Sequence, residues 1–274
     1  MQFIIENGKI KRDSEASAGH TYIEDAFILT QKVWFGFGGI PLFHENMELM
    51  EKQAVALNFF LPEEFRDRRE LLRLTKRMLN KNKFYRSGYI FYHSFYRGEK
   101  IYSIVTGRSS SEFDFPFSKD GILISFSDQK KTFNKLNRFA FFNKIIWDAS
   151  LRKLNDTYFQ NSIILNEKNM VCECAYGNIF MLRGNKLITP ALSTGCYEDL
   201  MRGIVIEEAQ NFDITVDEKD NISKNDLLAM DEIFIAGEQS GVNWILGVDN
   251  KRFIHTFSLD IYNKINEGLK LKTS

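Results

Sequence analysis

Short apolar runs and two stretches with helical spacing make up most of the first half of the chain. Residues 2–12, QFIIENGKIKR, predict a β-hairpin because Asn7-Gly8 is a strong turn signal between two short apolar runs. Residues 44–58 place methionine, alanine and leucine at helical spacing and predict an amphipathic helix. The same patterns predict a strand over 26–43 turning at Gly38-Gly39, a helix over 62–82, and a hairpin over 87–107 turning at Gly98-Glu99.

The second half alternates short apolar runs with turns. The run 122–127 predicts a strand, and the basic polar run 128–135 predicts a connection that leads to a helix from about Phe142 to Leu154. A second helix is expected from Leu200 to Asn211, and a third at the C-terminus. Further strands are predicted over 161–166, 170–182, 185–190, 231–237 and 242–248.

The polar segment 109–121 predicts a linker that divides the chain. We therefore expect two domains, a small α+β domain over residues 1–115 and a larger domain over 116–274.

Charge and cysteine content exclude several classes of protein. The 36 basic and 36 acidic residues cancel, so neither nucleic acid nor a membrane surface is an expected partner. Cys172, Cys174 and Cys196 give no disulfide framework, and the four histidines lack zinc-ligand spacing, so no metal site is expected. With no signal peptide and no apolar run long enough to span a bilayer, we expect a cytoplasmic protein.

Five landmarks follow one another in the second half: IILN, ECAYGNIF, ITPALSTGC, LMRGIVIE and EIFIAGEQSGV. In this order and spacing they resemble the class IV aminotransferase family of pyridoxal-phosphate proteins, which includes branched-chain and D-amino-acid aminotransferases and aminodeoxychorismate lyase. The resemblance implies an α/β (α+β) two-domain fold, with an N-terminal α+β sandwich and a C-terminal pseudo-barrel. It also implies a homodimer, with the site in the cleft between the domains.

Pyridoxal-phosphate chemistry requires a lysine amine for the Schiff base, a carboxylate on the pyridine nitrogen, and an anion site for the phosphate. By the resemblance, Glu173 falls on the family's ring-binding glutamate and Asn178 on a matching asparagine. The alternative is that Glu173 is a strand-edge residue without a functional role. Burying an ionisable group in an apolar strand is costly without a partner, which favours the ring-binding position.

The lysine position raises a difficulty. The family pattern is a lysine, two residues, an asparagine and then the large-domain helix, so Asn143 places Ala140 at the lysine position. Counting back without gaps from Glu173 also gives Ala140, which has no amine. Lys131, Lys135 and Lys144 are the alternatives. Lys131 fits the pattern as KTFN but would need a long insertion inside the following helix, and Lys144 should point elsewhere.

The positions that match the family's phosphate site are also altered. Leu49 replaces an arginine, Met201 after Leu200 replaces a hydroxyl residue, and Glu238 replaces a threonine. A carboxylate about 4 Å from a phosphate charge costs about 4 kcal/mol at an effective dielectric of about 20.

Three functions stay open. The first is a degenerate family member without Schiff-base catalysis that binds a small acid or a partner protein in its cleft. The second is an active pyridoxal-phosphate aminotransferase or aminodeoxychorismate-lyase-type enzyme that uses another lysine. The third is a structural subunit without a ligand.

Overall fold

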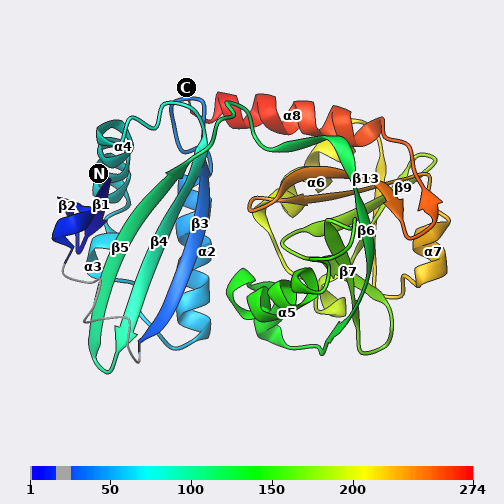
Figure 1. The fold of residues 1–274 in the computed structure, drawn as a ribbon, viewed down its shortest axis with the longest axis horizontal. Helices are drawn as coiled ribbons and strands as arrows, with labels where there is room; N and C mark the ends of the chain where they lie inside the picture. The colour runs from blue at the N-terminus through cyan, green and yellow to red at the C-terminus, as the bar shows by residue number, and fades with distance from the viewer. Residues whose placement is uncertain (1, 17–25, 274) are drawn as a thin grey trace. The chain divides into compact units, whose positions relative to one another are not determined.

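The computed structural model describes residues 2–16 and 26–273, which form two compact units (Figure 1). The first unit comprises the described residues up to 115 together with 268–273, and the second comprises residues 116–267. In the described parts of the chain, no helix is both long and apolar enough to cross a lipid bilayer.

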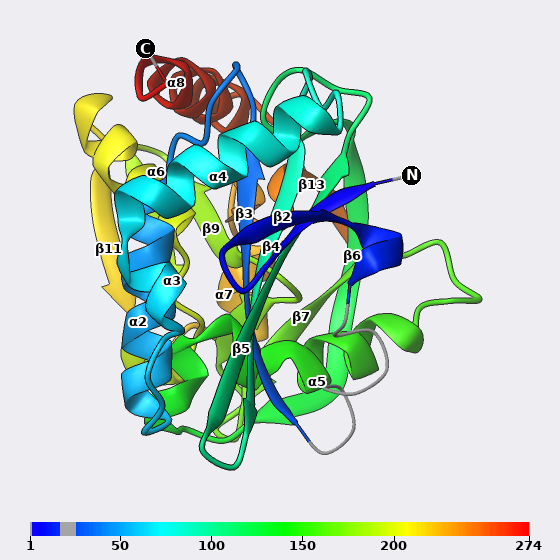
Figure 2. The ribbon, with the colours of Figure 1, turned by 90° about the vertical axis from the view of Figure 1, so that its left-hand side faces the viewer.

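The first unit is an antiparallel sheet with helices packed on it (Figure 2). Its first hairpin turns at Asn7 and Gly8, which take φ angles of 44° and 74° as a tight two-residue turn requires. The strand order is β2-β1-β5-β4-β3, formed by β1 Phe3–Glu6, β2 Lys9–Arg12, β3 Phe27–Phe35, β4 Gly88–Arg97 and β5 Lys100–Ser109; the 3-10 helix η1 spans Asp13–Glu15.

The helices of this unit differ from the prediction in one place. Helix α2 spans Phe43–Ala56, as the spacing of its apolar residues predicts. The single helix predicted over 62–82 is wrong, because the helix is interrupted at Asp67. The segment forms two helices, α3 Glu63–Arg66 and α4 Arg68–Lys81. The Asp67 carboxylate accepts a hydrogen bond from the Glu70 N–H at 3.0 Å and caps α4, a role that an aspartate takes more readily than a place inside a helix.

The second unit is built on one nine-stranded sheet. Its path is β11-β10-β9-β12-β13-β6-β7-β8, with β14 on β13, and strands β6, β7 and β13 run parallel. The strands are β6 Phe117–Lys131, β7 Asn161–Asn166, β8 Val171–Cys174, β9 Asn178–Arg183, β10 Lys186–Pro190, β11 Thr215–Lys219, β12 Glu232–Gly237, β13 Gly241–Val248 and β14 Lys251–Arg252.

The helices of the second unit lie between or beyond these strands. Helix α6 spans Leu200–Asn211, as predicted, and α5 begins two residues before its predicted start. The remaining helical elements are η2 Lys135–Arg138, α5 Ala140–Arg152, η3 Leu192–Thr194, α7 Lys224–Leu228 and α8 Phe257–Leu271, the last of which continues into the first unit.

Two predicted strands in this unit have other bounds in the structure. Strand β6 extends through the polar run to Lys131, because its hydrogen bonds to β7 continue past a register shift after Phe126. The strand predicted over 170–182 is two strands, since the chain turns at Tyr176 with a φ of 61° and β9 leaves to pair with β10 and β12. Strand β11 and helix α7 have no counterpart among the predicted elements.

Candidate functional site

Lys131 and Glu173 meet across the strand that separates them. Lys131 ends β6 and pairs with Asn166 of β7, while Glu173 on β8 pairs with Ile164 of the same strand. Ile164 and Asn166 are two residues apart and so lie on one face of the sheet. The two charged side chains are therefore directed to the same face, where the long lysine side chain can cross β7.

The two groups form a buried ion pair. The Lys131 Nζ lies 2.9 Å from Glu173 Oε2, and both side chains are 0% exposed. The other carboxylate oxygen accepts a hydrogen bond from Trp147 Nε1 at 2.6 Å, and Oε2 also accepts one from the Tyr197 backbone N–H at 2.6 Å. Glu173 thus has the partners that a buried carboxylate requires.

The other candidate lysine positions differ in their surroundings, since Ala140 lies beside two partners of Glu173, whereas the two lysines are exposed. Ala140 is the first residue of α5 and packs against the cluster of Trp147, Ile164, Ala175 and Tyr197. Lys135 and Lys144 are exposed on η2 and α5.

Lys131 is separated from α5 by a short connection rather than by α-helix. Residues 132–139 form a connection that contains η2, and α5 begins only after it and is continuous. Asn143 holds this connection to the helix, because its buried side-chain amide donates hydrogen bonds to the carbonyls of Asn137 and Phe139.

A second buried cluster surrounds the start of α6. Asp199 is its N-cap, and Asp199 Oδ1 accepts hydrogen bonds from the Met201 N–H at 2.7 Å and the Glu238 N–H at 3.0 Å. The Tyr197 hydroxyl donates to Asp199 Oδ2 at 2.5 Å. Burial raises the pKa of Asp199, although these three hydrogen bonds oppose the rise.

Tyr197 joins the two clusters. Its backbone N–H binds Glu173, its hydroxyl binds Asp199, and its ring packs edge-on against Trp147 with centroids 5.0 Å apart. Burial, followed by the charge of Asp199, raises the pKa of Tyr197 well above its usual value. A neutral, fully buried aromatic side chain therefore fills the space between the ion pair and the start of α6.

The remaining predicted site residues take supporting places. Asn178 is buried and its amide donates to the Tyr197 carbonyl, which fixes the loop before α6. Leu200 is half-buried, and Met201 and Glu238 are buried. Leu49 is half-buried on α2 of the first unit.

Sequence reasoning missed Trp147 and Tyr197 as site residues. The only signal for Trp147 is an indole with a donor N–H in an otherwise ordinary amphipathic helix, and buried indoles usually find an acceptor. Within residues 2–16 and 26–273, no group of three or more histidine, cysteine, aspartate or glutamate residues is arranged to hold a metal ion.

Comparison with known proteins identifies relatives of this chain. A family profile described as "Amino-transferase class IV" matches residues 102–244. A probable branched-chain-amino-acid aminotransferase of Thermotoga maritima is 33% identical over 91 residues, which are 33% of this chain and 32% of that protein. The aminodeoxychorismate lyase of Vibrio harveyi is 28% identical over 106 residues, 39% of either chain. These alignments span a third to two fifths of the curated relatives.

Solved structures resemble the chain over its whole length. The branched-chain aminotransferase of Thermobaculum terrenum in its PLP form matches with a TM-score of 0.85 at 16% identity, covering 99% of this chain and 94% of that one. The branched-chain amino acid aminotransferase of Escherichia coli matches with a TM-score of 0.82 at 16% identity, covering 100% and 96%. At such identities the likeness concerns the fold.

Proposed function

The chain belongs to the class IV aminotransferase family, and we propose that it is a member whose cofactor pocket is closed by its own side chains. The predicted family and the predicted α+β class IV fold are confirmed by the matching profile and the structural neighbours. The degenerate site is our proposal, and the direct contact between Lys131 and Glu173 at 2.9 Å is the observation that carries it.

The chemistry of pyridoxal phosphate explains why this contact matters. The cofactor's aldehyde carbon and its ring nitrogen lie on opposite sides of a six-membered ring, so an amine and a carboxylate that serve these two atoms must be separated by the ring. Lys131 and Glu173 instead touch each other, and Tyr197 binds the same carboxylate. The side chains in this arrangement do not fit the cofactor.

The start of α6 supports the same proposal. By the family resemblance, the phosphate would be held at positions 200, 201 and 238. The backbone N–H groups of Met201 and Glu238 are already bound to the Asp199 carboxylate, and the buried Glu238 side chain adds a second acidic group nearby. A phosphate there would have to displace one carboxylate and approach another, which is electrostatically unfavourable.

We propose that such a protein acts by binding rather than by lysine-linked catalysis. A fold can be kept after its chemistry is lost, because function resides in the site rather than in the fold. A small acid or a partner protein remains the proposed ligand, and a structural subunit without a ligand remains the alternative. A cytoplasmic location belongs to the same proposal, and the three free, buried cysteines support it.

One observation favours a second function, pyridoxal-phosphate-dependent transamination or lyase chemistry. Lys131 is a buried amine beside the glutamate that the resemblance assigns to the pyridine ring. If Lys131 left Glu173 and Asp199 released the two N–H groups, Lys131 would offer the amine that the cofactor's aldehyde requires. This candidate uses Lys131 and leaves Ala140, Lys135 and Lys144 without a catalytic role.

Absorbance and peptide mapping distinguish the two functions. The purified protein should be colourless, and pyridoxal phosphate should produce no lysine-linked absorbance near the violet edge of the visible. Borohydride reduction followed by peptide mapping should find Lys131 unmodified in the wild type. High-yield modification of Lys131 would establish the second function and refute the first.

A further inference from the structure

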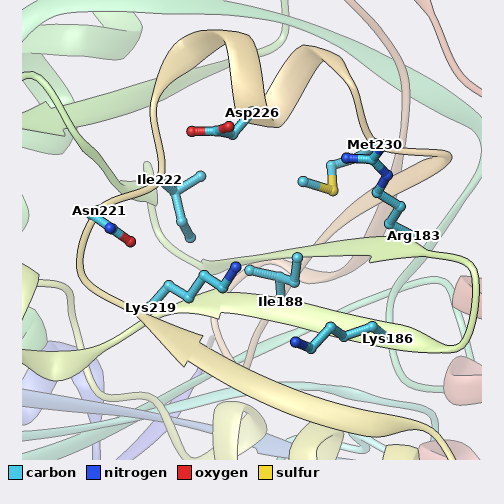
Figure 3. Close-up of a pocket in the computed structure, with 8 residues that line it drawn as sticks. All are labelled: Arg183, Lys186, Ile188, Lys219, Asn221, Ile222, Asp226 and Met230. Carbon is cyan, nitrogen blue, oxygen red and sulfur yellow. The ribbon is translucent and has the colours of Figure 1, made fainter.

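A hollow in the second unit lies among the ends of three strands and helix α7 (Figure 3). Its volume is about 370 Å³, within the range of pockets that hold small organic ligands. None of its lining residues belongs to the clusters around Lys131 and Asp199. The lining residues are Arg183, Lys186, Ile188, Lys219, Asn221, Ile222, Asp226 and Met230.

Cations outnumber anions in this lining. Arg183 ends β9, Lys186 begins β10 and Lys219 ends β11, so the three positive charges come from three neighbouring strands. Asp226 on α7 is the lining carboxylate, and it accepts hydrogen bonds from the Ser223 hydroxyl at 2.6 Å and the Ser223 N–H at 2.9 Å. Asp226 is therefore engaged in capping α7.

The positive charges of the hollow contribute to a lowered pKa of Asp226. Hydrogen bonds from Ser223 lower the pKa of Asp226 most, and the positive charges of Lys219 and Arg183 lower it further. The local field thus favours a negative group in this position. Lys186 and Lys219 share the carboxylate of Asp217, at 2.8 Å and 3.5 Å, and so are partly neutralised.

Arg183 differs from the two lysines in its pairing, since both lysines pair with Asp217. Among the residues that the structure describes, its guanidinium forms no hydrogen bond or ion pair. Its neighbour along the chain, Gly184, binds the nearby Asp231 carboxylate through the backbone N–H at 2.8 Å. Figure 3 shows the Arg183 head group beside Met230, on the opposite side of the hollow from Lys219. A guanidinium in this position can hold a carboxylate or phosphate with two parallel hydrogen bonds.

The apolar part of the hollow limits the chemical class of ligand that it can bind. Ile188, Ile222 and Met230 are 6%, 2% and 6% exposed, and they give the hollow an apolar wall beside its cations. An inorganic ion gains nothing from such a wall, whereas an apolar body attached to an acidic group gains from burial. We propose that this hollow binds a small organic anion, with Arg183 holding the acidic group and the apolar wall holding the body.

Binding of simple probes to the intact protein tests the proposal. The probes are phenyl phosphate, phenylacetate, inorganic phosphate and neutral phenethyl alcohol, titrated by calorimetry at low and high salt. We expect the two aromatic anions to bind, more weakly at high salt, and the alcohol and inorganic phosphate to bind at least tenfold more weakly.

Two matched variants assign the site. Arg183→Gln should reduce phenyl phosphate affinity by about tenfold or more, since it removes a charge-assisted pair. Arg69→Gln makes the same change at an exposed arginine of α4 and should leave affinity unchanged. Both arginines are exposed, so both variants should keep the wild-type unfolding midpoint. Equal affinity of wild type and Arg183→Gln, or equal binding of anion and alcohol, would overturn the proposal.

Discussion

At the scale of single residues, the molecule depends on how a buried lysine and a buried glutamate are matched. A charge that has left water is tolerable only when its partner and its hydrogen bonds are in place. Glu173 meets this condition through Lys131, Trp147 and Tyr197. Of these three partners only Lys131 carries a charge, so its loss leaves the buried carboxylate without a compensating cation.

Lys131→Met should therefore be strongly destabilising. We expect the free energy of unfolding to fall by about 3–5 kcal/mol, because Glu173 would stay buried without its cation. The double variant Lys131→Met with Glu173→Gln should recover most of this loss, since glutamine still accepts hydrogen bonds but carries no charge. Urea unfolding of both variants measures the difference.

Lys135→Met is the control for this experiment. Lys135 is exposed on η2, so the same substitution there should change the unfolding free energy by no more than about 0.5 kcal/mol. If the double variant is as unstable as Lys131→Met alone, charge matching is not the reason for the pair.

At the scale of elements, the start of α6 shows how one cap organises its surroundings. Asp199 receives N–H groups from its own helix, at Met201, and from the end of β12, at Glu238. An N-cap ordinarily accepts hydrogen bonds from its own helix. Asp199 also fixes the chain that follows β12. Its complete burial makes its ionisation costly, so its effect on stability must depend on pH.

The pH dependence has a definite sign. The pKa of Asp199 is raised in the folded protein above the ordinary value of 3.8, so between these two pKa values the folded state binds more protons than the unfolded state. The stability of the wild type relative to Asp199→Asn should therefore decrease as pH rises from below 3.8 through the raised pKa. Urea unfolding of both proteins across this range measures the slope.

Asp156→Asn, at an exposed aspartate in the turn after α5, serves as the matched control and should show no such slope. A relative stability that increases with pH would contradict the assignment of the effect to Asp199.

The sequence predicted elements with a strong local signal and failed where tertiary pairing decides. The hairpin at Asn7-Gly8 and the helix Leu200–Asn211 follow from turn chemistry and apolar spacing, and both are confirmed. The polar end of β6 carries no strand pattern in the sequence. It is extended because it pairs with β7. Lys131 lies on that end, so its contact with Glu173 depends on strand pairing that a single sequence does not display.

At the scale of the whole molecule, the resemblance of the chain to its family predicted the fold, and the structural neighbours confirm it. Fold depends on many apolar positions that tolerate substitution, and this fold resembles its structural neighbours at only 16% identity. A site depends on a few side chains in contact, such as Tyr197 with Asp199, and such contacts have no signature in a single sequence. The homodimer is one further expectation from the resemblance, and it stays a proposal.

The surface of α5 offers a specific test of the homodimer. Phe142 and Ile145 lie three residues apart on one face of this helix and are 39% and 82% exposed, and Phe133 in the preceding connection is 55% exposed. We propose that a second copy of the chain covers this face. Burying Ile145 contributes about 2 kcal/mol in each copy, so a symmetric dimer gains about 4 kcal/mol, or about a thousandfold in affinity.

Light scattering at micromolar concentration should therefore find a dimer for the wild type and a monomer for Ile145→Lys. Ile254→Lys makes the same change at a residue that is 74% exposed after β14, and this variant should remain a dimer. A wild-type monomer would refute the homodimer itself. A dimer that both variants preserve would instead place the interface away from α5, because a lysine ammonium buried opposite its own copy is too costly for a stable contact.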